Sequence, residues 1–192
     1  MSRMINTGAM LLFAVASAAL AGAADTKAAV PASPKDVTPL KAGETAPTAT
    51  LKDAGKENVD LAKIFASKPT VLIFYRGSWC PYCTAHLADM AKAEPKLIEM
   101  GFQIIAVSPD KPADLKKMAD STKAAYQLLS DEDHAFARAY GVSFGAKHEL
   151  PVPSVYIIGK DKTILFAHWE ADYKKRLKAD EVIAAASKVK VE

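Results

Sequence analysis

Short apolar runs alternate with amphipathic stretches along the chain from about residue 41 onward. Residues 71–75 are a continuous apolar run, and residues 102–107 are apolar except for Gln103; both patterns predict strands that are buried in a sheet. Stretches with apolar residues at helical spacing lie between and after these runs, and they predict helices at 61–67, 84–100, 112–123, 133–140 and 179–188.

Pairs of short apolar segments separated by polar turns predict two hairpins. One joins residues 48–51 to 58–61, and the other joins 154–158 to 163–167. A further short strand is expected at 126–129. Strands that alternate with helices in this way indicate an α/β fold, with a central mixed β-sheet flanked by helices, in a single domain over residues 41–192.

Residues 1–23 have the pattern of a secretory signal peptide. Arg3 precedes an apolar core at 9–16, and an A-x-A cleavage site at 21–23 predicts a mature start at Ala24. An uncleaved membrane anchor is the alternative, although the apolar stretch is shorter than the roughly 20 residues of a spanning helix. The absence of a cysteine near the cut excludes a lipoprotein anchor. We therefore expect an exported protein, periplasmic if its source is bacterial.

Residues 24–40 are rich in Ala, Pro, Lys and Thr and have no apolar periodicity, which predicts a flexible linker before the domain. The formal net charge of the chain is +3, and its basic residues are dispersed except for a small cluster at 174–178. A cluster of this size is typical of a solvated helix face. Neither nucleic-acid binding nor stable membrane insertion of the mature protein is therefore expected.

The two cysteines of the chain both lie in the tetrapeptide Cys80-Pro81-Tyr82-Cys83, between the run at 71–75 and the helix at 84–100. The unpaired N–H groups and the dipole at a helix N-terminus favour an anion. Such a position lowers a cysteine pKa from about 8.5 to roughly 3.5–7.5, and the thiolate is the nucleophile. Cys80 is therefore expected to be the more exposed and reactive thiol, with Cys83 placed to close a disulfide with it.

Two other interpretations of the cysteine pair are open. A structural disulfide across so short a loop would add little chain-entropy stabilisation. A Cu(I) or zinc carrier would use Cys80, Cys83 and His86, but a closed zinc site needs four ligands and the remaining histidines stand singly. The pattern therefore favours redox chemistry of the thiols, with no resident metal and no other cofactor.

The order of strands and helices, with a C-x-x-C at the first buried strand-to-helix junction, is a thioredoxin-like layout. Val152-Pro153 directly precedes the strand at 154–158, where thioredoxin-like folds have a cis-proline against the active-site cysteines. We therefore expect a cis bond before Pro153, with an ordinary strand-entry proline as the alternative. Trp79 and Pro153 would shape the docking surface beside Cys80.

Residues 74–83 read F-Y-R-G-S-W-C-P-Y-C and resemble the active site of peroxiredoxin-like proteins in the AhpC/TSA branch of the thioredoxin superfamily. The pattern of that group is F-Y-R-G-x-W-C-P-Y-C. The resemblance covers about residues 41–190 and implies a thioredoxin-like fold with a redox-active cysteine pair. Further segments similar to this group lie at 43–47, 107–110, 128–131, 140–142 and 172–176.

The chain departs from typical peroxiredoxins, which carry P-x-x-x-T-x-x-C with the peroxidatic cysteine last. With Cys83 on that cysteine, Arg76 takes the place of the proline and Cys80 that of the threonine. The later active-site arginine of the family falls near Pro153, so that guanidinium is missing from its usual place. Arg76 is a candidate to supply positive charge instead.

The resemblance implies an antioxidant enzyme that reduces peroxide by a dithiol–disulfide cycle. Cys83 would become a sulfenic acid and condense with Cys80, and an unidentified external thiol would reduce the resulting disulfide. A protein disulfide reductase is the close alternative, with Cys80 as the nucleophile and Cys83 as the resolving thiol. A non-enzymatic binding module is a third. Both enzymatic cycles end in the same disulfide, so the sequence alone does not separate them.

Overall fold

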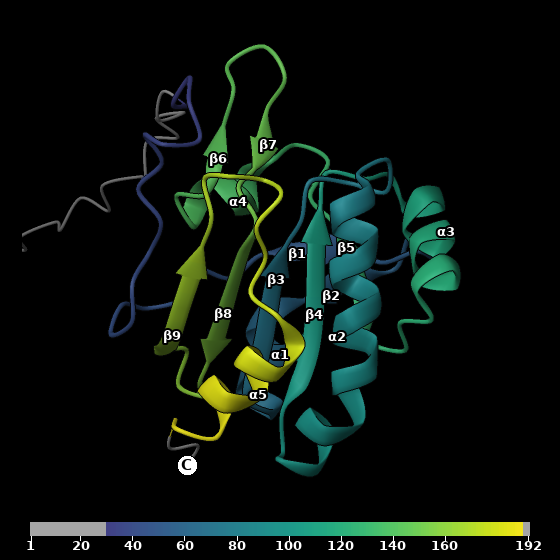
Figure 1. The fold of residues 1–192 in the computed structure, drawn as a ribbon, viewed down its shortest axis with the longest axis vertical. Coiled ribbons are helices and arrows are strands. Elements are labelled where there is room, and N and C mark those ends of the chain that lie inside the picture. Colours follow the sequence, from purple (N-terminus) through teal and green to yellow (C-terminus); the bar gives the residue numbers. More distant parts are fainter. Residues whose placement is uncertain (1–29, 190–192) are drawn as a thin grey trace, which may run out of the picture.

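A seven-stranded mixed sheet runs through the middle of the computed structural model, which describes residues 30–189 (Figure 1). The strands lie in the order β2-β1-β5-β4-β3-β8-β9. β3, β4 and β5 are parallel to one another, and the remaining strands join antiparallel. The strand bounds are Thr50–Lys52 (β1), Asn58–Asp60 (β2), Thr70–Phe74 (β3), Gln103–Ser108 (β4), Gln127–Ser130 (β5), Ser154–Ile158 (β8) and Ile164–Trp169 (β9).

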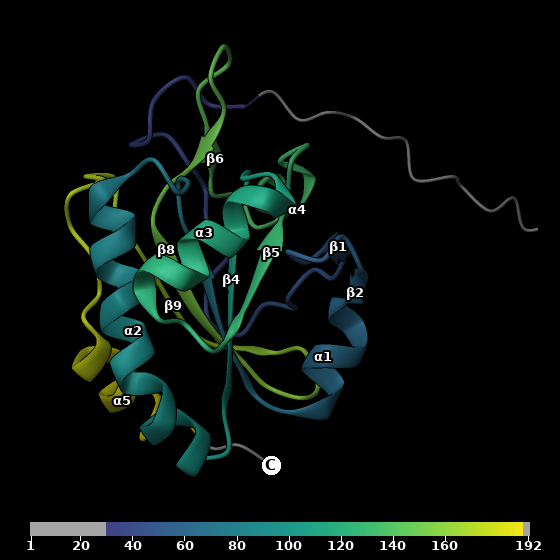
Figure 2. The ribbon, with the colours of Figure 1, turned by 90° about the vertical axis from the view of Figure 1, so that its right-hand side faces the viewer.

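Helices cover both faces of this sheet, and Figure 2 shows α2 and α5 on one side of it and α1 on the other. The predicted α/β class with a mixed central sheet is therefore confirmed. Within residues 30–189, no helix is long and apolar enough to cross a membrane. The helix bounds are Leu61–Ser67 (α1), Pro81–Glu99 (α2), Pro112–Thr122 (α3), Ala135–Ala139 (α4) and Ala179–Ala186 (α5).

The central strand β3 supplies side chains to both layers, and all of its residues are buried. Val71 and Ile73 pack into the core under α2, α3 and α5, whereas Leu72 and Phe74 pack into the core under α1 and α4. This division follows because successive side chains of a strand point to opposite faces. A continuous apolar run is thus the expected sequence of a strand with helices on both sides.

The two cores differ in content, and we name them accordingly. The thiol face is the side covered by α2, α3 and α5, because Cys80 and Cys83 belong to its core. The aromatic face is the side covered by α1 and α4, and its core contains a cluster of rings from Phe74, Phe136, Tyr140 and Tyr156.

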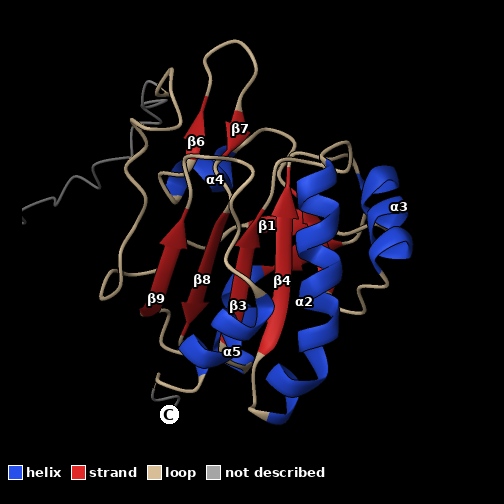
Figure 3. Cartoon of the chain, in the orientation of Figure 1, coloured by secondary structure: helices blue, strands red, loops and turns tan. Residues whose placement is uncertain are grey.

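Both predicted hairpins are present, as β1–β2 and β8–β9. Figure 3 shows β8 and β9 side by side at one edge of the sheet. The structure adds a third hairpin, formed by β6 (Ser143–Phe144) and β7 (Leu150–Pro151). Strands of two residues are too short for an apolar alternation to mark them, so the sequence pattern does not predict this hairpin.

Helix α2 begins at Pro81, earlier than the predicted residue 84. Proline suits the first helical position because its fixed φ is helical and its missing N–H has no partner to lose there. Cys80 is consequently the N-cap residue and Cys83 lies inside the first turn. The earlier start places the second thiol within the helix rather than before it.

The flexible linker predicted at 24–40 is wrong for residues 30–40, which lie along the domain. Leu40 N–H donates to the carbonyl of Tyr140 (3.1 Å), and Gly145 N–H donates to that of Pro31 (2.7 Å). Val37 and Leu40 pack against the aromatic face. Backbone hydrogen bonds of this kind leave no trace in composition. Residues 24–29 and the predicted signal peptide lie outside the described residues.

Candidate active site

The loop between β3 and α2 carries the two thiols. The carbonyl of Cys80 accepts hydrogen bonds from the backbone N–H groups of Cys83 (3.0 Å) and Thr84 (3.1 Å). Gly77 has a φ of 144°, and a Cβ there would lie 2.6 Å from Nε1 of Trp79. Only glycine therefore fits the turn that brings the chain from the strand to the helix.

Asp110 holds this loop from behind. One of its carboxylate oxygens accepts hydrogen bonds from the N–H of Ser78 (2.8 Å) and the hydroxyl of Ser108 (3.0 Å). Its carbonyl accepts a hydrogen bond from the hydroxyl of Ser130 at the end of β5 (2.7 Å). Burial raises the pKa of Asp110, while the hydrogen bonds from Ser108 and Ser78 favour its charged form. Asp110 thus ties the thiol loop to the ends of two neighbouring strands.

Both thiols are free, and both are buried. Cys80 is 1% exposed and Cys83 is 0% exposed, so exposure does not distinguish the two thiols and Cys80 is not the exposed nucleophile that the sequence predicts. Residues 170–178, which connect β9 to α5, run along the thiol face in front of the sheet (Figure 1). We call them the cover segment, because Arg176 within it contacts Cys83.

Cys83 is surrounded by groups that act on its pKa in opposite directions. Nη2 of Arg176 lies 3.4 Å from Sγ of Cys83 and donates to it. This guanidinium and the backbone N–H of Arg76 favour the thiolate, but burial dominates and raises the pKa of Cys83 to about 11. The hydrogen bond with the Cys80 thiol contributes to this rise. The structure therefore holds Cys83 as a neutral thiol with thiolate-stabilising donors already in place.

Arg176 is the site residue that the sequence did not single out. Its Nη1 donates to the backbone carbonyls of Tyr173 and Lys175, which orients Nη2 toward Cys83. The one signal for it was the resemblance of residues 172–176 to the peroxiredoxin-like group. Typical peroxiredoxins would have a guanidinium near Pro153. In this chain the guanidinium of Arg176 lies next to Cys83 instead.

Arg76 and Trp79, two of the predicted supporting residues, lie together beside the thiols. Cζ of Arg76 is 5.1 Å from the ring centroid of Trp79 and 4.5 Å from that of Tyr173. The rings of Tyr82 and Tyr173 meet edge to face at 5.6 Å. Trp79 is 60% exposed, and Tyr82 and Tyr173 are each 40% exposed. These contacts join the thiol loop, the first turn of α2 and the cover segment.

The proposed metal set of Cys80, Cys83 and His86 is not assembled. Burial and the nearby charge of Arg176 lower the pKa of His86 to about 4. Across residues 30–189, no group of three or more His, Cys, Asp or Glu side chains is placed to hold a metal ion. The described residues therefore provide no three-ligand site of the kind that the copper or zinc carrier would use.

The predicted cis bond before Pro153 is wrong, because every peptide bond in the described part of the chain is trans. Val152 N–H donates to the carbonyl of Val142 (2.8 Å), and the carbonyl of Pro153 accepts from the N–H of Glu170 (3.0 Å). These bonds hold the chain on both sides of the proline as it enters β8. Pro153 is thus the ordinary strand-entry proline that was the alternative.

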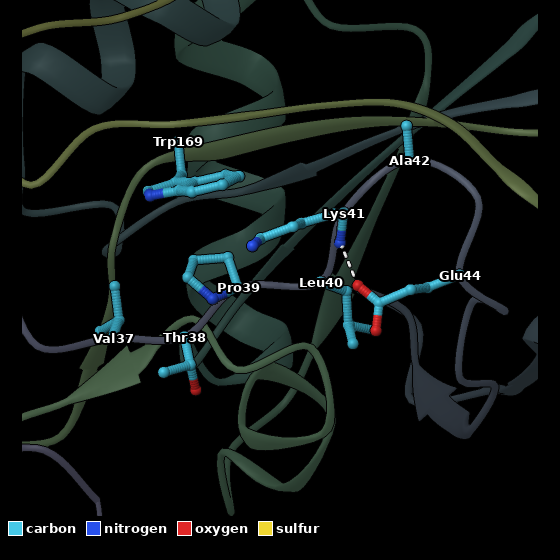
Figure 4. Close-up of a pocket in the computed structure, with 8 residues that line it drawn as sticks. All are labelled: Val37, Thr38, Pro39, Leu40, Lys41, Ala42, Glu44 and Trp169. Carbon is cyan, nitrogen blue, oxygen red and sulfur yellow. Dashed lines mark hydrogen bonds between the residues drawn. The ribbon is translucent and has the colours of Figure 1, made fainter.

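A separate hollow of about 690 Å³ lies between the N-terminal segment and the end of β9 (Figure 4). It is lined by residues 37–42, Glu44 and Trp169. Inside it, the backbone N–H of Lys41 donates to the carboxylate of Glu44 (2.6 Å). None of the predicted site residues lines this hollow, so it is not part of the thiol site.

Comparison with known sequences identifies peroxiredoxins among the relatives of this chain. The model of the AhpC/TSA family matches residues 42–167. Chloroplastic peroxiredoxin Q of Gentiana triflora is 33% identical over 122 residues, which are 64% of this chain and 56% of that protein. Peroxiredoxin Bcp of Escherichia coli K12 is 34% identical over 104 residues, 54% of this chain and 66% of that protein. The matches thus span less than two thirds of the length of either relative.

Solved structures share the fold. Peroxidoxin BcpB from Mycobacterium tuberculosis superimposes with a TM-score of 0.69 at 24% identity, over 79% of this chain and 99% of that one. Reduced Prx3 from Vibrio vulnificus in complex with hydrogen peroxide gives a TM-score of 0.70 at 23% identity, over 77% of this chain and 99% of that one. At these identities the likeness establishes the fold.

Proposed function

Because the chain belongs to the AhpC/TSA family, we propose that it is a thiol-dependent peroxidase that works through Cys83 and Cys80. The curated relatives that it matches are named peroxiredoxins. The substrate is then a peroxide, and the cycle needs an external thiol as its source of electrons. No further cofactor takes part in this cycle.

The proposed cycle has three steps. The Cys83 thiolate attacks one peroxide oxygen, the O–O bond breaks, and water or an alcohol leaves after taking up a proton, so that Cys83 becomes a sulfenic acid. The Cys80 thiol then loses its proton and attacks the sulfenic sulfur, the hydroxyl group leaves as water after taking up a proton, and a Cys80–Cys83 disulfide forms. Two thiols of the external reductant finally reduce this disulfide by exchange and are themselves oxidised to a disulfide.

The hydrogen bond from Arg176 to Cys83 is the single observation that carries this proposal. A guanidinium at this place favours the attacking thiolate and the negative charge that develops on the leaving oxygen. The backbone N–H of Arg76 acts on the same sulfur. Within the described residues both of these donors act on Cys83. This supports Cys83 rather than Cys80 as the thiol that reacts with peroxide.

The burial of both thiols adds a requirement to the cycle. Since burial is the largest cause of the raised Cys83 pKa, admitting water lowers that pKa and increases the fraction of thiolate. Displacement of the cover segment would expose the sulfur to both water and peroxide. Opening and activation of the thiol are thus the same event in this proposal.

Disulfide reduction with Cys80 as the nucleophile is the second candidate. The exposed rings of Trp79, Tyr82 and Tyr173 favour it, because exposed aromatic side chains next to a reactive thiol are suited to dock a protein. In this case Cys80 would attack a substrate disulfide and Cys83 would resolve the mixed disulfide.

Single cysteine variants distinguish the two candidates. The Cys80→Ser protein is expected to consume one equivalent of hydrogen peroxide and to stop at a sulfenic acid on Cys83, detected by mass spectrometry. The Cys83→Ser protein is expected not to react with peroxide above the rate of an ordinary thiol. A Cys83→Ser protein that instead traps a stable mixed disulfide through Cys80 would favour disulfide reduction.

The proposed site of action is outside the cytoplasm, and periplasmic in a bacterium, because residues 1–23 have the pattern of a signal peptide. Expression of the full chain in a bacterium, followed by fractionation and N-terminal mass analysis, tests this proposal. A periplasmic product that begins at Ala24 is expected. A product that keeps residues 1–23 in the cytoplasmic fraction would contradict it.

A further inference from the structure

Arg76 differs from the other arginines of the described chain in having an unused guanidinium. Arg138 is paired with Glu149 at 2.8 Å, and Arg176 donates to Cys83. Within residues 30–189, the guanidinium of Arg76 has no carboxylate at ion-pair distance and donates to no acceptor, and its Nε is buried without a partner. Buried polar groups are normally hydrogen-bonded, so an unpartnered one needs an explanation.

The neighbours of Arg76 hold its guanidinium in position without using its N–H donors. Its Cζ lies over the rings of Trp79 and Tyr173, at 5.1 and 4.5 Å from their centroids. Cation–π contacts of this kind fix a guanidinium through its charge. The N–H donors on Nη1 and Nη2, which have no partner within residues 30–189, therefore stay available to a ligand.

The place of this guanidinium relates it to the reacting sulfur. Arg76 comes from the loop that carries the thiols, and its backbone N–H acts on Cys83. The guanidinium of Arg76 contacts the ring of Tyr173. The carbonyl of Tyr173 accepts a hydrogen bond from Arg176, which also donates to Cys83. A small molecule held by the Arg76 side chain would thus lie at the cover of the thiols.

We propose that the guanidinium of Arg76 binds a carboxylate on a small molecule that reacts at the cysteine pair. The planar guanidinium matches a carboxylate in charge and in its paired donor geometry. The exposed rings of Trp79 and Tyr173 receive the apolar part of the same molecule. This proposal rests on the proposed function, which makes the molecule either the peroxide or the thiol reductant.

Binding to the reduced protein is tested first, without any reaction. Calorimetry compares 4-isopropylbenzoate with its neutral isostere 4-isopropylbenzamide. The carboxylate is expected to bind at least about tenfold more tightly, as a charge-assisted hydrogen bond allows. Arg76→Gln should remove this preference, and Arg76→Lys, which keeps the charge without the planar fork, should retain part of it.

Lys174→Gln is the matched control, because Nζ of Lys174 also lies over the Tyr173 ring, at 5.9 Å, and its removal costs the same charge. The control should keep the full preference. If Lys174→Gln and Arg76→Gln lost the preference for the carboxylate equally, the preference would come from the general positive charge of this surface, and the proposal would be overturned. Equal binding of the acid and the amide by the parent protein would overturn it as well.

Kinetics then identify which reactant carries the carboxylate. The first pair is cumene hydroperoxide and its para-carboxylate, and the second is 2-mercaptoethanol and 3-mercaptopropionate as reductants of the oxidised protein. For each pair, the rate with the carboxylate compound is divided by the rate with the neutral compound. This ratio is compared between the parent and Arg76→Gln, so that the intrinsic reactivities of the two compounds cancel. A ratio about tenfold higher in the parent is expected for one of the two pairs.

The outcomes separate this proposal from the proposed function. Turnover of cumene hydroperoxide with unchanged ratios in both pairs would overturn the role of Arg76 and leave the peroxidase intact. Failure to reduce any peroxide would contradict the peroxidase. In that case the calorimetric preference and the reductant pair still decide whether Arg76 binds a carboxylate.

Discussion

The aromatic face and the thiol face are built on the same central strand, yet they satisfy their buried groups differently. On the aromatic face, the rings of Phe74, Phe136, Tyr140 and Tyr156 contact one another with centroids 4.9 to 6.1 Å apart. The hydroxyl of Tyr140 donates to the carbonyl of Pro47 (3.1 Å). Three polar atoms away from the thiols are nevertheless buried without a partner within the described residues: the hydroxyls of Tyr156 and Ser143 and Nδ1 of His134.

Several buried polar atoms of the thiol site have no hydrogen-bond partner among the described residues. Nε of Arg76, Nε of Arg176 and both ring nitrogens of His86 are buried without a partner within residues 30–189. Cys83 is held neutral against two donors that favour its thiolate. Close packing of aromatic rings stabilises a fold. Unpaired hydrogen-bond donors around a thiol whose pKa is shifted are instead typical of a site that acts on a ligand. The aromatic face thus contributes mainly to stability, whereas the thiol face carries the chemistry.

The largest expected effect removes a ring from the aromatic face. Phe74→Ala should lower the free energy of unfolding by about 4 kcal/mol, because Phe74 is 1% exposed and contacts three other rings. Urea denaturation of the reduced protein measures this loss. The reaction of Cys83 with peroxide should persist at temperatures where the variant is folded. A loss below about 1 kcal/mol would show that this face is not the main source of stability.

The converse change removes the cation from Cys83. Arg176→Gln should slow the reaction with hydrogen peroxide about a hundredfold, while the free energy of unfolding changes by less than about 1 kcal/mol. Stopped-flow kinetics and urea denaturation measure the two quantities. Lys175→Gln removes a charge from the adjacent residue and serves as the control. Equal slowing in both variants would mean that Arg176 acts only through the general field.

Residues 30–40 extend the comparison, because they pack on the aromatic face. A chain that starts at Lys41 should lose about 2 kcal/mol of unfolding free energy relative to one that starts at Ala24. It loses the partly buried side chains of Val37 and Leu40 and the hydrogen bonds of this segment to the domain. Its peroxide kinetics at 25 °C should stay unchanged. Equal melting temperatures for the two chains would contradict this expectation.

The smallest effect is a dependence on pH that belongs to the thiol face. The pKa of Cys83, about 11 in the folded protein, lies above the unfolded value of about 8.5. The folded protein therefore keeps a proton that the unfolded chain releases, and the free energy of unfolding falls as pH rises between these values. The slope from this group is at most about 1.4 kcal/mol per pH unit.

Cys83→Ser should flatten that slope, since serine does not titrate in this range. Urea denaturation at intervals from pH 7 to 10 compares the variant with the parent. The two proteins should run in parallel below about pH 8, where both states of Cys83 are protonated. The same slope for both proteins above pH 9 would show that Cys83 is not held as a neutral thiol.

Local patterns along the chain were sufficient to predict most elements of the fold. The apolar run at 71–75, the two hairpins and the helices each follow from periodicity or turn residues within a few positions. The errors lie where the local pattern is weak. A two-residue strand has no period, a first helical turn carries little amphipathic signal, and the N-terminal segment binds the domain through backbone groups that composition does not reveal.

The sequence by itself determined that two thiols stand between a buried strand and a helix, since that depends only on neighbours in the chain. It also marked Arg76 and Trp79, which adjoin the cysteines. Only the tertiary structure decided which cation meets Cys83, because Arg176 is remote from it in sequence and arrives on a loop after the last strand. It likewise decided that both thiols are buried and that the guanidinium of Arg76 has no hydrogen-bond acceptor among residues 30–189. Periodicity reports the face on which a residue lies, but the convergence of side chains from separate elements depends on how those elements pack.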